Sequence, residues 1–431
     1  MTSTQRCGCP DYESSLPSLG RRGFLGGAGL LAGAMTAGSL FDGAHRQVAY
    51  GANPDGNVVI VLSLRGGSDG VSVIVPKSPT DQAHLQAKRP GIIVPTDRLI
   101  GSDPRFGLHP ALAPLLPMWT AGTFGAVHAV GMSQPNRSHF SSMEQVERAA
   151  PGSGERTGWI NRAIGLDPAA KPEEAMQIGS NMVPAQLVGP AASLGIDSLN
   201  DLALPRLWND QALAAGLRQT WSTGTSALRD GVLTALDVVG RLEPVTATDL
   251  DPIKAQFPEG PLREVLANTV ALVNAQVGAK VITIDYGDWD MHTGLGPPDP
   301  GNWMYDHLTH LARSLKAFFA GLSPAMASKV TVVTISEFGR RIEQNGENGV
   351  DHGYGNCMLL FGAGVRGGQV HGQWPGLADD DLIDGDLAVK QDYRSVLWEV
   401  LSSRFPQSPV SGSLSTVFPG FTPDAGLDCM S

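Results

Sequence analysis

The sequence predicts an α/β fold in which a mainly parallel sheet is covered by helices on both faces. Short, continuously apolar runs such as Val58–Leu64 and Val281–Tyr286 have the length and composition of buried strands. These runs alternate along the chain with longer amphipathic stretches, which is the pattern of a parallel sheet with crossover helices. The 53 glycines and 31 prolines among 431 residues require many turns and argue against a helical bundle or coiled coil.

The expected elements follow one another over most of the chain. Strands are predicted at residues 58–64, 124–130, 281–286, 330–336 and 358–361. Helices are predicted at residues 110–119, 140–148, 213–242, 261–278, 303–322 and 393–401, the last of which is expected to end the fold. Ser138 is expected near the N-cap of the second helix. No internal repeat or clear boundary divides residues 52–431, so we expect a single domain there.

Residues 1–51 are predicted to be an export signal rather than part of the fold. Arg21 and Arg22 form a twin-arginine signature before an uncharged stretch at 23–41, and residues 49–51 suit cleavage. A transmembrane anchor is the alternative, but the many glycines and alanines make the stretch only weakly hydrophobic, which favours a signal. The protein is therefore expected in the periplasm, the cell wall or outside the cell, with membrane contact only before cleavage.

Charge and cysteine content exclude several classes of protein. The net charge is −11, and without a basic stripe the chain is not expected to bind nucleic acid. Cys7 and Cys9 belong to the predicted signal, which leaves Cys357 and Cys429. Two cysteines cannot form a zinc–cysteine site or a disulfide framework, although one disulfide remains open in an oxidising compartment.

Polar residues cluster where the predicted strands end or begin. In a parallel sheet, ligands gather at the carboxyl ends of the strands. The candidates at these points are Asp69, Ser138, Asp288, Asp290, His292, Glu337, Arg340, Asp351 and His352. Carboxylates and imidazoles from several strands suit a divalent metal, for which zinc, manganese, calcium and magnesium all remain open.

Several of these residues also have purely structural explanations. Asp69 could cap the turn after the first strand, and Glu337 could pair with Arg340. His139 could stack in the core. The argument for a site therefore rests on the set of clusters and not on any one residue.

A serine nucleophile elbow is the competing interpretation of the first cluster. Residues 66–70 (GGSDG) match the G-x-S-x-G pattern around Ser68, which requires a strand, a tight turn and then a helix. Residues 71–76 have the composition of a strand, so the helix is expected to be missing. The phosphate-binding pattern G-x-x-x-x-G-K-[ST] does not occur.

The motifs together resemble a known family. In order they are L-R-G-G-S-D-G, F-G-L-H-P-A-L, N-R-S-H-F, W-D-M-H, S-E-F-G-R and D-H-G-Y-G-N, spread from about residue 58 to 401. After a twin-arginine signal, this order resembles the exported domain-of-unknown-function 1501 family of the alkaline-phosphatase-like superfamily. The resemblance implies an alkaline-phosphatase-like sandwich and a two-metal site, and the superfamily includes phosphatases, sulfatases and phosphoglycerate mutases.

The resemblance also implies roles for particular residues. Asp69 is similar to the metal-binding aspartate after the superfamily's first strand, and Ser138 to its nucleophile at a helix start. Asp288 and His292 match an Asp and a His four apart, while Asp290 lies in the narrower W-D-x-H motif, so both acids are retained.

The central-strand motif departs from the superfamily. Phe338 of S-E-F-G-R stands where the superfamily has the histidine of Asp-His-Gly, and a phenylalanine cannot bind a metal. Asp351 and His352 match the superfamily's last histidine motif instead, and Arg340 could bind an anion.

Two functions follow as hypotheses. The first is an exported metal-dependent hydrolase of phosphate or sulfate esters, in which Ser138 attacks an anionic small molecule or a cell-envelope substrate. The second is a non-catalytic binding or assembly protein of the cell envelope on the same fold.

Overall fold

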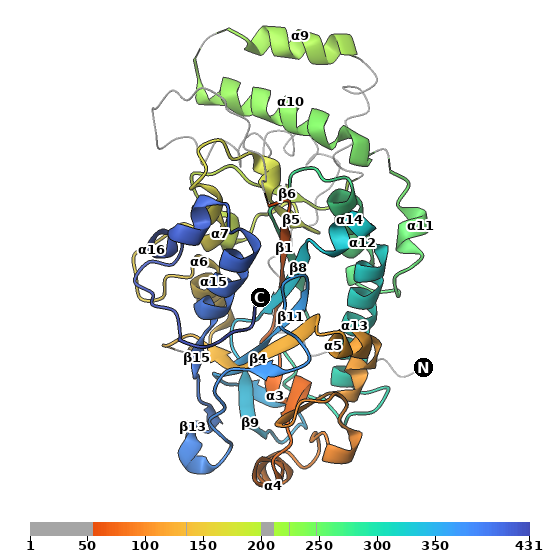
Figure 1. Cartoon of the computed structure of the whole chain (residues 1–431), viewed down its shortest axis with the longest axis vertical. Helices are drawn as coiled ribbons and strands as arrows, with labels where there is room; N and C mark the ends of the chain where they lie inside the picture. Colours follow the sequence, from red (N-terminus) through yellow and green to blue (C-terminus); the bar gives the residue numbers. More distant parts are fainter. Residues whose placement is uncertain (1–54, 135, 200–210, 224, 247) are drawn as a thin grey trace.

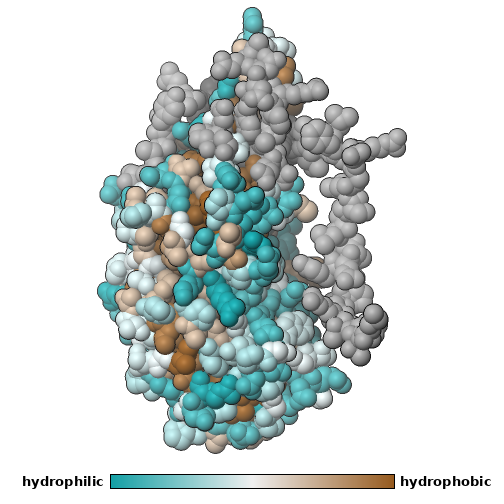
Figure 2. Space-filling view, turned by 90° about the vertical axis from the view of Figure 1, so that its right-hand side faces the viewer, coloured by the Kyte–Doolittle hydropathy of each residue, from teal (hydrophilic) through white to brown (hydrophobic). Residues whose placement is uncertain are grey.

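The computed structural model describes residues 55–134, 136–199, 211–223, 225–246 and 248–431. The predicted export signal at residues 1–51, with Cys7 and Cys9, lies outside the described residues, so it stays a prediction. No helix in the described ranges combines the length and apolarity needed to cross a membrane. The face seen in Figure 2 carries mostly polar side chains, and its apolar residues form small, separate patches.

A nine-stranded sheet forms the centre of the molecule, in the order β12-β4-β11-β8-β1-β7-β5-β6, with β15 beside β4. The strands are β1 Val58–Leu64, β4 Phe124–Gly131, β5 Ala175–Ile178, β6 Leu194–Ile196, β7 Val281–Tyr286, β8 Val330–Ile335, β11 Asn356–Gly362, β12 Val370–His371 and β15 Gln391–Asp392. All pairs are parallel except those of β11, which runs antiparallel to both β4 and β8. The predicted mainly parallel sheet is therefore confirmed.

Helices cover both faces of this sheet (Figure 1). The longer ones are α4 Pro79–Lys88, α6 His139–Arg148, α9 Gln211–Trp221, α10 Ala227–Thr246, α12 Leu262–Asn274, α13 Trp303–Gly321 and α15 Tyr393–Arg404. Shorter α-helices are α3 Gly70–Val73, α5 Leu116–Thr120, α7 Trp159–Ile164, α11 Asp251–Lys254, α14 Pro324–Ala327 and α16 Leu414–Val417. In Figure 1, α12, α13 and α14 lie on one side, and α6, α7, α15 and α16 on the other.

Strand β1 shows why its run of residues is continuously apolar. Ile60 and Leu62 belong to one core cluster, which includes buried residues of α12 and α13. Val59 and Val61 belong to a second cluster, with buried residues of α7 and α15. Successive side chains of a strand point to opposite faces, so both sets are buried. Burial of each such side chain contributes roughly 1.5–3 kcal/mol.

Two smaller antiparallel sheets complete the fold. One has the order β10-β9-β14-β13 and contains β9 Arg340–Gln344, β10 Val350–His352, β13 Leu382–Ile383 and β14 Asp386–Leu387. The other pairs β2 Ile74–Pro76 with β3 Phe106–Leu108. The first of these sheets carries three of the predicted site residues, Arg340, Asp351 and His352.

Three details differ from the predictions. Residues 70–73, expected to be extended, form the one-turn helix α3, and β2 starts only at Ile74. The single helix expected at 213–242 is two helices, because the Ser-, Thr- and Gly-rich residues 222–226 separate α9 from α10. The fold also continues beyond α15, since Val417 and Phe418 are fully buried.

The two described cysteines do not form a disulfide. Cys357 and Cys429 are both free and buried. The thiol of Cys429 donates to Glu399 over 3.0 Å. The disulfide that the sequence left open is thus absent from the described part of the chain.

Candidate metal centre

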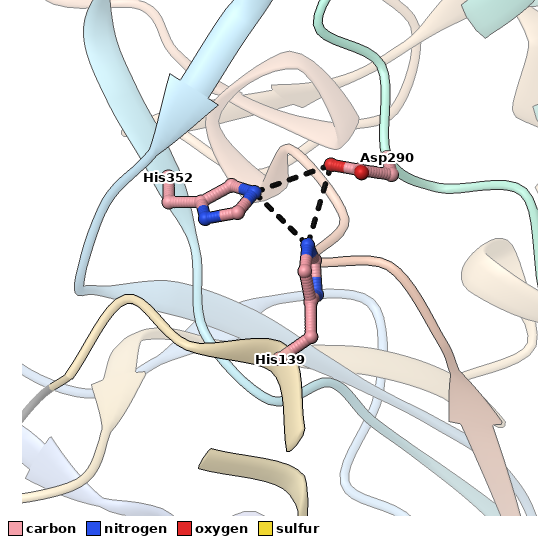
Figure 3. A group of neighbouring side chains, drawn as sticks. All are labelled: His139, Asp290 and His352. Carbon is pink, nitrogen blue, oxygen red and sulfur yellow. Dashed lines mark hydrogen bonds and ion pairs between the residues drawn. The ribbon is translucent and has the colours of Figure 1, made fainter. Parts of the chain in front are cut away.

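Side chains from four separate segments meet at one edge of the central sheet. His139 begins α6 after β4, while Asp290 and His292 lie in the loop after β7. Glu337 follows β8, and His352 ends β10. The strands β4, β7 and β8 point the same way, so their carboxyl ends share an edge, as the sequence predicted. Figure 3 shows His139, Asp290 and His352 pointing toward one another from different elements.

The ligand atoms of this imidazole cluster (His139, Asp290, His292 and His352) lie very close together. The Nε2 of His352 is 2.9 Å from the Nε2 of His139 and 2.9 Å from that of His292. Asp290 Oδ1 is 3.0 Å from His292 Nε2, 3.3 Å from His352 Nε2 and 3.4 Å from His139 Nε2. The ligand atoms of His139, Asp290 and His352 therefore form one compact group, and His292 adjoins this group through Asp290 and His352.

The other nitrogen of each ring is fixed by an acceptor. The Nδ1–H groups donate from His139 to Glu337 Oε1 (2.7 Å), from His292 to Asp351 Oδ1 (2.9 Å) and from His352 to the Arg137 carbonyl (2.8 Å). Carboxylates and carbonyls only accept hydrogen bonds here, so each neutral ring carries its proton on Nδ1. Each Nε2 then presents a lone pair to the shared space.

This donor set fits a divalent cation. Lone pairs 2.9 Å apart repel one another unless a positive charge lies between them. Tetrahedral Zn–N bonds of about 2.0–2.1 Å would separate ligand atoms by about 3.3 Å, close to the separations in the cluster. Metal-binding histidines usually donate their other N–H to a carboxylate or a carbonyl, which is the arrangement of all three rings.

The titration behaviour of the cluster points the same way. Burial alone would lower the pKa of His139, but its hydrogen bonds with Asp290 and Glu337 raise that pKa to about 9. Burial would raise the pKa of Asp290, yet hydrogen bonds from the imidazoles and Arg340 hold it well below its usual range. The hydrogen bond with Asp290 raises the pKa of His292. A pKa of about 9 means that His139 carries an extra proton at neutral pH when the site is free, and a bound cation would replace that proton on Nε2.

Glu337 holds a ligand in position and does not enter the imidazole cluster. Its Oε1 accepts from His139 Nδ1 over 2.7 Å and from the Gly66 backbone N–H over 2.8 Å. Burial would raise the pKa of Glu337, but these hydrogen bonds hold it below its usual value. The residue predicted as a ligand is therefore better described as the carboxylate that orients His139.

Arg340 is buried, whereas its predicted role as an anion-binding residue requires an accessible guanidinium. It is 1% exposed and donates to the carbonyls of Gly66, Gly67, Trp289 and Val350 and to Asp290 Oδ1. Its contact with Asp290 is 2.7 Å long. A guanidinium enclosed in this way cannot receive a substrate, so its role is to fix Asp290.

Of the four predicted acids outside the imidazole cluster, Glu337 and Asp351 orient its histidines, while Asp69 and Asp288 do not contact it in the described residues. Asp69 is 2% exposed and pairs with Arg89 over 2.7 Å, and it also accepts from the Ser72 hydroxyl. The ion pair and the hydroxyl use Oδ2 of the carboxylate that was predicted to bind metal, while Oδ1 is buried without a hydrogen-bond partner in the described residues. Asp288 is exposed and adopts a positive φ of 63°, and no contact joins it to the cluster within the described residues. Of the two acids in the W-D-x-H region, only Asp290 reaches the cluster.

His139 is the ligand that the sequence interpretation missed. The sequence left open whether His139 stacks in the core or joins the site, and it was not among the predicted ligands. Ser138 is the N-cap residue of α6, but its side chain makes no capping hydrogen bond and is exposed. The sequence feature that could have identified His139 is its position in the segment that follows a predicted strand.

Phe338 fills space beside the imidazole cluster. Its ring lies 4.8 Å from the His139 ring and 4.7 Å from the His352 ring, measured between centroids. A second metal would need ligands at the position of this apolar ring. The described residues therefore offer one metal position here, formed most tightly by His139, Asp290 and His352.

The competing serine elbow is not supported by the surroundings of Ser68. A one-turn helix does follow the loop, contrary to expectation. Ser68 is nevertheless 2% exposed, and its Oγ accepts from the Asn356 amide over 3.3 Å. No imidazole contacts Ser68 within the described residues, so the base that would activate it is missing.

A family comparison identifies the relatives of the chain. The family described as "Protein of unknown function (DUF1501)" matches residues 113–386. The chain belongs to this family. The matched range of the DUF1501 protein includes His139, Asp290 and His352. No curated protein matches the sequence.

Solved structures similar to the DUF1501 protein are all distant in sequence. The C-terminal periplasmic domain of EcEptC from Escherichia coli, in complex with Zn, is 11% identical, with 74% of this chain and 77% of that chain covered and a TM-score of 0.33. A protein in the alkaline phosphatase superfamily from Vibrio parahaemolyticus is 9% identical, with 88% and 75% covered and a TM-score of 0.34.

The lipoteichoic acid synthase LtaP from Listeria monocytogenes is a third similar structure. It is 8% identical, with 81% of this chain and 73% of that chain covered and a TM-score of 0.30. These likenesses agree with the predicted fold, but at such TM-scores they carry no argument about chemistry. The chemistry has to come from the imidazole cluster itself.

Proposed function

We propose that this protein is an exported metal-dependent hydrolase of phosphate or sulfate esters. One observation carries the proposal: the ligand atoms of His139, Asp290 and His352 lie within 4.8 Å of one another, His292 contacts two of them, and each imidazole is oriented by an acceptor at its Nδ1. This is the arrangement of a binding site prepared for a single cation.

The donor set favours a transition metal, zinc first. Calcium and magnesium prefer oxygen ligands, whereas imidazole suits zinc, iron, copper and nickel. His139, His292, His352 and Asp290 would hold the metal. A divalent cation there would polarise an ester oxygen and lower the pKa of a nearby hydroxyl.

Ser138 is the proposed nucleophile. Its hydroxyl is exposed, makes no capping bond, and belongs to the residue next to the ligand His139. Ser138 also starts the ten-residue helix α6, whose N-terminus carries partial positive charge and unpaired backbone N–H groups. These groups would stabilise the negative charge of a phosphoryl or sulfuryl group at the serine.

Metal analysis combined with a substrate screen tests the proposal. The purified mature protein should contain one metal per chain and should hydrolyse phosphate or sulfate monoesters. We expect His352→Ala to lose both metal and turnover, and Ser138→Ala to keep the metal but lose turnover. Ser328→Ala, which changes an exposed serine after α14, is the matched control and should change neither. Full turnover in Ser138→Ala would exclude Ser138 as the nucleophile.

A non-catalytic binding or assembly role is the second candidate. Two observations favour it. The apolar ring of Phe338 packs beside the rings of His139 and His352. Arg340 is buried, so it cannot bind a substrate anion. One bound metal per chain without turnover on any phosphate or sulfate ester would establish this role and reject the hydrolase.

Export has its own test. Replacing Arg21 and Arg22 by lysine should trap the full-length protein inside the cell if the twin-arginine route carries it. Unchanged export of this double variant would reject that route, and it would leave the hydrolase proposal untouched.

A further inference from the structure

A separate pocket is lined by residues of β15 and of the loops that follow β4 and β10. It is a pocket of about 540 Å³, and its walls include Tyr354, Lys390, Asp392, Arg394, Phe421 and Asp424. Pockets that bind small molecules usually measure about 300–1,000 Å³ and place a few polar groups among rings and apolar side chains. The size and the lining both fit a small-molecule site.

A short chain of contacts joins this pocket to the imidazole cluster. Tyr354 lines the pocket, and the Arg137 guanidinium lies over its ring at 4.5 Å from the centroid. The backbone carbonyl of Arg137 accepts from Nδ1 of His352 over 2.8 Å. Ser138, the proposed nucleophile, follows Arg137 directly. Neighbouring segments of the chain therefore carry the pocket wall, the proposed nucleophile and the ligand His352.

Arg394 is the most unusual wall residue. It is 7% exposed, and its guanidinium stacks on the Phe421 ring at 4.5 Å. Its Nε and Nη2 donate to the two carboxylate oxygens of Asp392 over 2.9 and 2.6 Å. Nη1 has no hydrogen-bond partner in the described part of the chain. Nη1 is accessible to solvent, so it is able to donate to water or to a bound ligand.

The other charges of the pocket balance one another. Asp424 uses one carboxylate oxygen, Oδ2, to accept from Ser395 Oγ and from the Asp392 backbone N–H. Lys390 is exposed at the edge. Two cationic and two anionic side chains thus surround the space, which suits neither a polyanion nor a purely apolar ligand. Hydroxyl groups fit best, because each can both donate and accept.

We infer that this pocket binds the alcohol part of the ester as a polyhydroxylated ring, that is, a sugar. Arg394 and Arg137 each cover one face of Phe421 and Tyr354, so the C–H face of the sugar would pack against the uncovered parts of these rings. The charged side chains would bind its hydroxyls. This inference rests on the proposed function, and it makes the substrate a sugar phosphate or a sugar sulfate.

Binding of neutral sugars tests the pocket apart from catalysis. The probes are the methyl glycosides of glucose, galactose, mannose and fucose, with cyclohexanol as a ring that carries a single hydroxyl. Saturation-transfer NMR on the mature protein should detect at least one glycoside and not cyclohexanol. We expect Phe421→Leu and the exposed variant Lys390→Ala to weaken that binding by about tenfold.

Two control variants locate the effect. His352→Ala, which removes a metal ligand, and Lys316→Ala, which changes an exposed lysine of α13, should both retain glycoside binding. Binding that survives in both Phe421→Leu and Lys390→Ala, equal binding of cyclohexanol, or no glycoside binding at all would each overturn the inference.

The two proposals fail in different ways. If glycosides bind but no ester is hydrolysed, the hydrolase proposal fails and the sugar pocket stands. If esters are hydrolysed but no glycoside binds, the pocket is rejected and the hydrolase stands.

Discussion

At the residue scale, the three histidines differ mainly in what holds Nδ1. His139 is held by a carboxylate that is itself buried, His292 by the exposed Asp351, and His352 by a backbone carbonyl. The acceptors fix the tautomer and the direction of each Nε2. Substitution of an acceptor should therefore weaken metal binding without removing any ligand.

Asp351→Ala should lower metal affinity by about 10–100-fold, the usual effect of losing such an orienting partner. The measurement is a competition titration with a metal-binding dye. Glu343→Ala removes an exposed acid from β9 in the same small sheet and serves as the control. Equal dissociation constants for the two variants would show that Asp351 does not orient His292.

His128 gives a pH prediction at a distance from the metal centre. It is 1% exposed, its Nε2–H donates to the Ile74 carbonyl, and its Nδ1 accepts from the Ala129 N–H. Burial lowers its pKa to about 4, below the ordinary 6.5. The neutral ring therefore contributes fully to stability above pH 6.5, and that contribution is lost as the pH falls toward 4. The loss is roughly 1.4 kcal/mol per pH unit.

Urea unfolding of wild type and His128→Gln at pH 7.5 and 5 tests this. The variant should be less stable at pH 7.5, and the difference should shrink by about 2 kcal/mol at pH 5. The same difference at both pH values would contradict the assignment of a buried, neutral His128.

At the scale of elements, the metal centre depends on two loops that touch. Gly339 precedes β9, and its N–H donates to the Tyr354 carbonyl, while its own carbonyl accepts from the Gly353 N–H. A Cβ at Gly339 would overlap the Gly355 carbonyl oxygen. The S-E-F-G-R and D-H-G-Y-G segments can thus meet only because Gly339 has no side chain.

Gly339→Ala should destabilise the fold by about 2 kcal/mol and should displace His352 enough to weaken metal binding. Gly346→Ala is a matched control, because nothing lies within 4 Å of an added Cβ there. Thermal unfolding and metal titration of both variants give the answer. Equal melting temperatures and equal metal affinities of the two variants would contradict this close packing of the S-E-F-G-R and D-H-G-Y-G segments.

At the scale of the whole molecule, one bound metal would join segments that are far apart in the chain, from His139 to His352. Binding to the folded state alone stabilises it, by about 2.7 kcal/mol at a metal concentration 100 times the dissociation constant. For a chain of this size that raises the melting temperature by about 3 °C. Calorimetry should show this increase in wild type, and its appearance in His352→Ala would contradict the site.

The sequence predicted the main features of this molecule because they follow local rules. Apolar runs of residues predicted the strands β1, β7 and β8. Positions next to predicted strands indicated Asp290, His292 and His352 as site residues. Contacts between distant residues could not be predicted in this way. Nothing near Asp69 in the sequence shows that its carboxylate will pair with Arg89. Nothing in S-E-F-G-R shows that four backbone carbonyls will surround Arg340. His139 was not predicted as a ligand because nothing in N-R-S-H-F distinguishes a histidine packed in the core from one that binds a metal.

Anomalous X-ray scattering from crystals grown with zinc tests the central claim most directly. We predict a single strong peak about 2.0–2.2 Å from the three Nε2 atoms and from Asp290 Oδ1. Zinc-soaked crystals with no peak among these four atoms, or with the only peak elsewhere, would contradict the account.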